Sequence, residues 1–203
     1  MGINFQTQKL AGHFPELWRG ESKVLPGGFK PANTLAIGTV IRPGSPLYVD
    51  FDTRSAAVCK TAKVVNGGTT TAPRVLKGHY FAVGDTVAVN DGTVKQTVKS
   101  IDTTNADYDV ITFNAALTGV KADDVLIETD SATLADGAKA APRFAPNMVA
   151  PLFKEIKATG INTLDAAYDA IVLIPSLAAT PMISSWLNGC FLAANPNILY
   201  IKQ

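Results

Sequence analysis

Between residues 73 and 129 the chain is a succession of short β-forming runs, each closed by residues typical of turns. The clearest turn is Asp91-Gly92, because this dipeptide tolerates the positive φ angles of a tight hairpin. Four or five short strands with local connections are typical of a small antiparallel barrel or sandwich. This stretch therefore predicts a mainly β protein. The runs expected to form its strands are 79–89, 93–101, 108–113 and 125–129.

The flanking segments complete a predicted β-rich α+β organisation. Residues 35–41, 47–51 and 56–65 indicate three further strands, and their pairing with the central stretch stays open. We therefore predict a β-barrel or sandwich core over residues 34–129. Residues 130–203 are expected to form a C-terminal α+β segment of short helices and strands. This segment packs on the core or on a neighbouring subunit.

Residues 1–33 are predicted to form an extended N-terminal arm, because glycine and proline recur too often for a regular helix. Trp18 next to Arg19 is a plausible interface anchor, although it could equally plug one end of the chain's own barrel. The apolar C-terminal run is expected to pair with a sheet edge of this chain or of another subunit. The interface residues predicted from both ends are Phe5, Leu10, Phe14, Trp18, Phe29, Ile198 and Tyr200.

Composition and charge bear on the partners of the chain. A net charge of +1 without a basic run argues against nucleic acid as a partner, because duplex binding requires several neutralised phosphates. Only 17% of the residues are charged, which favours a surface that assembly covers. No segment reaches the roughly 18 apolar residues of a membrane span. The first ten residues lack an apolar signal core, so we expect no export by the usual secretory route and folding in the cytoplasm.

The search for catalytic or metal-binding motifs finds little. The two histidines, His13 and His79, lie in no zinc-type spacing, and no serine lies in a nucleophile elbow. A trio of His79, Asp85 and a serine is conceivable, but chance alone supplies such trios in a chain of this size. Gly84-Asp85 has the character of a turn, in which the aspartate caps the backbone. We therefore predict no enzyme activity, no metal and no cofactor.

Two segments of the sequence resemble segments of bacteriophage head proteins that decorate capsids. They are Leu-Lys-Gly-His-Tyr-Phe-Ala-Val-Gly-Asp-Thr-Val at 76–87 and Gly-Thr-Val-Ile-Arg-Pro-Gly-Ser-Pro-Leu at 38–47. The C-terminal ending from Trp186 is similar to head-fibre proteins of phages and prophages of gut Bacteroidetes. The resemblance implies a non-enzymatic virion protein on the outer capsid surface. Its partner would be the major capsid protein, and it would often be a homotrimer.

Two other functions remain open at the level of sequence. A glycan- or receptor-binding β-module would present an exposed aromatic cluster, for which Tyr48, Tyr80 and Tyr108 are the candidates. A tail, baseplate or head-completion component could use the same turn-and-strand phrases.

Overall fold

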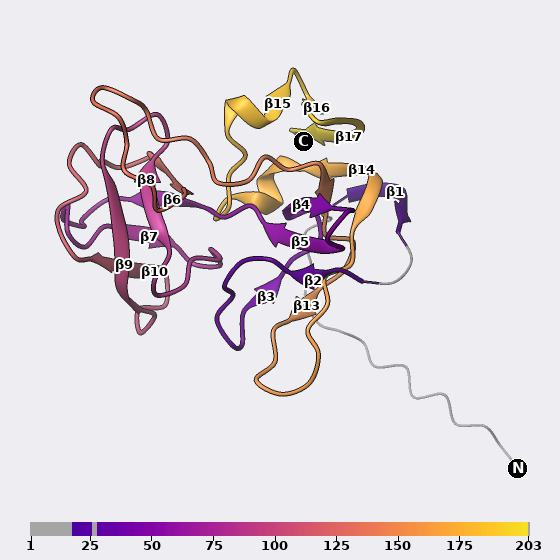
Figure 1. The fold of residues 1–203 in the computed structure, drawn as a ribbon, viewed down its shortest axis with the longest axis horizontal. Coiled ribbons are helices and arrows are strands. Elements are labelled where there is room, and N and C mark those ends of the chain that lie inside the picture. The colour runs from indigo at the N-terminus through magenta and orange to yellow at the C-terminus, as the bar shows by residue number, and fades with distance from the viewer. Residues whose placement is uncertain (1–17, 26–27, 203) are drawn as a thin grey trace, which may run out of the picture.

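The computed structural model describes residues 18–25 and 28–202 of the chain. Regular structure in these residues is almost entirely β, which confirms the predicted β-rich fold. Figure 1 shows a barrel beside a larger sheet. The helical turns are two short 3₁₀ helices in the C-terminal segment, η1 (Ile174–Leu177) and η2 (Ser184–Trp186).

The barrel is closed by six antiparallel strands in the order β10-β7-β6-β11-β8-β9. Closure leaves it without a free sheet edge. Asp91 adopts a φ of 61° in the connection between β8 and β9, as its turn dipeptide predicts. Inward-facing residues such as Val87, Ile111 and Leu126 fill the interior. The strands are β6 (Thr61–Val65), β7 (Arg74–Leu76), β8 (Thr86–Val89), β9 (Lys95–Asp102), β10 (Tyr108–Phe113) and β11 (Val125–Glu128).

The predicted strand 79–89 is wrong over its first half, since only Thr86–Val89 is β-strand. Gly84 adopts a φ of 93°, and the Asp85 carboxylate accepts a hydrogen bond from the backbone N–H of Ala82 at 2.7 Å. These two features fold the preceding residues into a turn. The neighbours Tyr80 and Phe81 then enter two different hydrophobic cores.

The second body is a nine-stranded sheet that contains both the first and the last strand of the described residues. Its main path runs β15-β16-β17-β14-β12-β4-β5-β2, and β1 pairs with β14 off this path. Two of its pairings, β14 with β17 and β2 with β5, are parallel. The strands are β1 (Trp18–Val24), β2 (Lys30–Pro31), β4 (Pro46–Asp50), β5 (Ser55–Val58), β12 (Met148–Val149), β14 (Ala167–Leu173), β15 (Leu187–Asn188), β16 (Phe191–Leu192) and β17 (Asn195–Ile201).

The run 56–65, predicted as one strand, is divided between the two bodies. The backbone N–H of Cys59 donates to the carbonyl of Pro46 in the sheet, whereas the carbonyl of Lys60 accepts from Glu128 of the barrel. The chain therefore changes sheets between these two residues. As a result, the predicted core 34–129 is split, and its first part pairs with the C-terminal segment through β4 and β12. A local pattern cannot reveal this change, because both halves of the run are β-forming.

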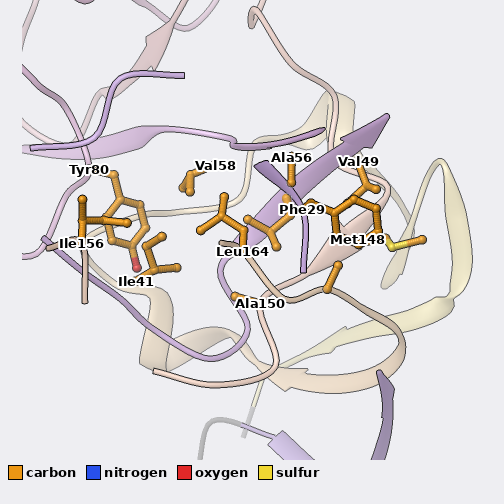
Figure 2. Close-up of a cluster of buried hydrophobic side chains, with 12 residues drawn as sticks. Phe29, Ile41, Val49, Ala56, Val58, Tyr80, Met148, Ala150, Ile156 and Leu164 are labelled. Carbon is orange, nitrogen blue, oxygen red and sulfur yellow. The ribbon is translucent and has the colours of Figure 1, made fainter. Parts of the chain in front are cut away.

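The sheet encloses a core to which distant parts of the chain contribute. Figure 2 shows Phe29 beside Val49 and Met148, with Tyr80, Ile41 and Ile156 at the other end of the cluster. Phe29 comes from the predicted arm, whose residues 28–33 therefore lie on the chain's own sheet. The run 166–174 forms β14 in the structure, and the C-terminal run pairs with it as β17.

Candidate functional site

The predicted interface residues lie in different environments in the structure. Phe5, Leu10 and Phe14 lie outside the described residues. Trp18 begins β1, where its backbone pairs with Val172 of β14. The described part of the arm is therefore integrated into the sheet through β1 and the segment around Lys30.

Three of the predicted interface residues are core residues. Phe29, Ile198 and Tyr200 are at most 5% exposed, and each packs in a hydrophobic cluster of this same chain. Burial raises the pKa of Tyr200 far above its ordinary value. The expectation that these side chains face a partner is corrected, because hydrophobicity in the sequence does not distinguish a core anchor from an interface anchor.

Five of the eleven exposed large apolar side chains of the described residues lie instead on two paired loops. β3 (Val40–Ile41) and β13 (Lys154–Glu155) form a small antiparallel sheet, which projects from the larger sheet with its flanking loops (Figure 1). The apolar residues here are 45% to 91% exposed. We call this set the loop surface, and it consists of Ile37, Val40, Leu152, Phe153 and Ile161.

Backbone hydrogen bonds fix the two loops against each other. Gly38 has a φ of 84° and donates its N–H to Ile156, which donates its own to Thr39. The amide side chain of Asn162 bonds both backbone groups of Lys157 and closes the second loop. These hydrogen bonds therefore hold in place the loops that carry the exposed apolar residues. An exposed apolar patch of this kind is a mark of a protein–protein contact.

A buried charged cluster lies at the junction of barrel and sheet. The Lys60 ammonium, at the change of sheets, is fully buried and donates to Asp85 Oδ2 at 2.6 Å and to the Thr34 carbonyl at 2.5 Å. Glu128, at the end of β11, places its Oε2 at 3.9 Å from Lys60 Nζ. Three parts of the chain thus bring one amine and two carboxylates together in a water-poor site.

Glu128 is held by two further residues. Asn33 donates to its Oε2 at 3.1 Å and Arg143 donates to its Oε1 at 3.2 Å. Burial raises the pKa of Glu128, while the Lys60 charge opposes this shift. The Glu128 carboxyl group therefore keeps its proton to a higher pH than an exposed glutamate would.

His79 lies in a separate buried pair and not in a catalytic trio with Asp85. Its Nδ1 accepts the backbone N–H of Phe81, and its Nε2 lies 3.4 Å from Asp109 Oδ2. Lys77 donates to the other oxygen of Asp109 at 2.6 Å. Burial lowers the pKa of His79, and Asp109 acts in the opposite direction.

The three tyrosines proposed for glycan stacking are not brought together. Tyr80 is buried, with its hydroxyl accepting from the backbone N–H of Arg42 and 2.7 Å from Ser45 Oγ. Tyr48 stacks on Phe144, and Tyr108 lies under the Arg74 guanidinium on the barrel. A surface hollow of about 470 Å³ beside β9 is lined by threonines, Lys95 and other non-aromatic residues.

The sequence predicted Asp85 only as a turn cap and did not predict its partner Lys60 or the neighbouring Glu128. The cap is confirmed, but the same oxygen also binds the ammonium group. One signal was present in the sequence: Lys60 interrupts an apolar run, and a lysine there must be paired if it is buried. Which carboxylates pair with it depends on strand connections that are remote in sequence.

Other kinds of site receive little support within the described residues. They contain no group of three or more His, Cys, Asp or Glu residues placed to hold a metal ion. No helix in this part of the chain is long and apolar enough to cross a membrane. Comparison of the chain with protein-family models, with curated proteins and with solved structures finds no match.

Proposed function

We propose that the chain is a structural virion protein that binds the outer surface of a bacteriophage capsid. The observation that carries this proposal is the loop surface, where braced loops display Ile37, Phe153 and Ile161 to solvent. The segments 38–47 and 76–87, which resemble capsid-decorating proteins, indicate that the partner is a capsid protein. The partner is the major capsid protein, and the function requires no catalysis.

The architecture supports this role because the folded body and the exposed apolar surface are separate parts of the molecule. The closed barrel and the large sheet supply a rigid body, and the loop surface supplies contacts at one end of it. A protein that binds only the assembled shell stabilises that shell by mass action. As a homotrimer, the chain would present three copies of the surface at once, and weak contacts would then act together.

The proposal is tested by a capsid co-sedimentation assay on charged variants of the loop surface. In one variant, Phe153→Asp and Ile161→Asp are combined. Val83→Asp is the control, because Val83 is 61% exposed, close to the 62% of Phe153, but lies in the turn before β8. The capsids are assembled from the major capsid protein encoded in the same genome.

The double variant is expected to bind capsids at least about tenfold more weakly, a loss of about 1.4 kcal/mol or more, because apolar anchors carry much of an interface's energy. The Val83 variant is expected to bind like the parent chain. Equal capsid binding by the parent chain and both variants would show that the loop surface does not contact the capsid. Absence of capsid binding by the parent chain would overturn the function itself.

A further inference from the structure

The charged cluster at the junction contains more than an ordinary ion pair. Lys60 and Asp85 side chains are 0% and 5% exposed, and their polar atoms meet at 2.6 Å. The second carboxylate, Glu128, is 3% exposed and lies 3.9 Å from the same nitrogen. An amine, a carboxyl group as its acceptor and a second carboxyl group beside both are therefore held together away from water.

The buried contact holds the Lys60 amine and the Asp85 carboxyl group within reach of each other. The ion pair and the neutral pair of amine and carboxylic acid contain the same atoms and differ by one proton moved from Nζ to the carboxyl group. A neutral amine is a nucleophile, and a carboxylic acid has a carbon that it can attack.

We propose that the folded chain joins Lys60 and Asp85 by an intramolecular isopeptide bond. The lone pair of Lys60 Nζ attacks Asp85 Cγ and forms the C–N bond. The bond between Cγ and one carboxyl oxygen breaks, and that oxygen leaves as water. The water carries one hydrogen from the amine and the hydroxyl of the acid, so atoms and charge balance without an oxidant, a metal or a cofactor.

The neighbouring groups suit the individual steps. Glu128 Oε2 lies 3.9 Å from Lys60 Nζ. An approach of about 1 Å therefore brings it within reach of the proton on the attacking nitrogen, which it then passes to the departing oxygen. The backbone N–H of Ala82 donates to Asp85 Oδ2 at 2.7 Å, where negative charge develops in the tetrahedral intermediate. The Thr34 carbonyl orients the amine at 2.5 Å. Fixed proximity of this kind supplies the effective concentration that free amines and acids lack in water.

The bond would close a loop of the barrel next to its junction with the sheet. It would connect the start of β6 to the turn before β8, across 25 residues of sequence. A covalent closure of this loop reduces the entropy of the unfolded chain and slows loss of the fold. This property is independent of the partner, because it belongs to the folded chain alone.

The decisive experiment is the mass of the purified full chain under denaturing conditions, followed by a tryptic peptide map. The proposal predicts a chain lighter than its sequence by one water. It also predicts no cleavage after Lys60 and a branched peptide that joins Lys60 to Asp85. A full-sequence mass together with cleavage after Lys60 would overturn the proposal, whatever the variants do.

Variants assign the roles of the side chains. Glu128→Gln is expected to fold but to retain the full mass of its sequence, because it cannot relay the proton. A complete cross-link in this variant would overturn the role of Glu128. Asp85→Asn is expected to lose ammonia in place of water where it reacts, which identifies the carbon attacked; a loss of water from this variant would overturn the assignment to Asp85.

Lys77→Arg is the matched control. Lys77 Nζ also lies 2.6 Å from an aspartate, Asp109, but its side chain is 34% exposed to solvent. Its replacement is expected to leave the cross-link at full yield. A loss of the cross-link in this control, with the fold retained, would contradict the assignment to Lys60.

Discussion

His79 shows how a single buried residue couples the fold to pH. Its pKa is lowered from the usual 6.5, mainly by burial. In the unfolded chain this imidazole takes up a proton near pH 6.5, whereas in the folded chain it stays neutral to lower pH. The unfolded state therefore binds more protons in this window, and stability is lost as pH falls below 6.5 towards the folded-state pKa.

We predict that the free energy of unfolding decreases on acidification through this window, with a contribution from His79 of up to about 1.4 kcal/mol per pH unit. His79→Gln is expected to remove that contribution. Chemical denaturation at a series of pH values measures it, and His13→Gln controls for the second histidine of the chain. Identical pH slopes for the parent chain and His79→Gln would refute the prediction.

At the scale of elements, β17 tests the correction made to the C-terminal run. Ile198 is fully buried in the cluster formed by β14, β17 and their neighbours, whereas Leu199 next to it is half-buried. Ile198→Ala is expected to lower the free energy of unfolding by about 2–5 kcal/mol, because it leaves a cavity in the core. Leu199→Ala is expected to cost less, since less apolar surface is lost from the interior.

Unfolding of both variants should be measured at several protein concentrations. If Ile198 is a core residue, the decrease in unfolding free energy caused by Ile198→Ala does not depend on protein concentration, because the cavity lies within one chain. A decrease in unfolding free energy that becomes larger on dilution would instead indicate that Ile198 lies in an interface between subunits.

Local patterns predicted the elements whose partners are close in sequence. The Asp91-Gly92 turn and the strand at 108–113 follow from turn chemistry and β propensity, and both are present. The run 56–65 failed as a single strand because its halves pair with β4 and β11, which are far apart in sequence. For the same reason the sequence could not place Lys60 beside Asp85, or distinguish a core Phe29 from an exposed Phe153.

At the scale of the whole molecule, a two-part β body carries one surface of exposed apolar side chains. The barrel and the sheet meet at the buried cluster around Lys60, and the loop surface projects beyond the sheet. A rigid support keeps the ordering cost of binding small, because little freedom is lost when the loops contact a partner. This combination suits a protein that adds stability to a preformed shell.

The central claim is most directly tested by mixing the purified full chain with assembled capsids and, separately, with unassembled capsid protein, and measuring what sediments. The capsid protein is the one encoded in the same genome. The account predicts that the chain sediments with assembled capsids, saturates at a fixed ratio and ignores unassembled subunits. A chain that stays in the supernatant at every capsid concentration would contradict the account.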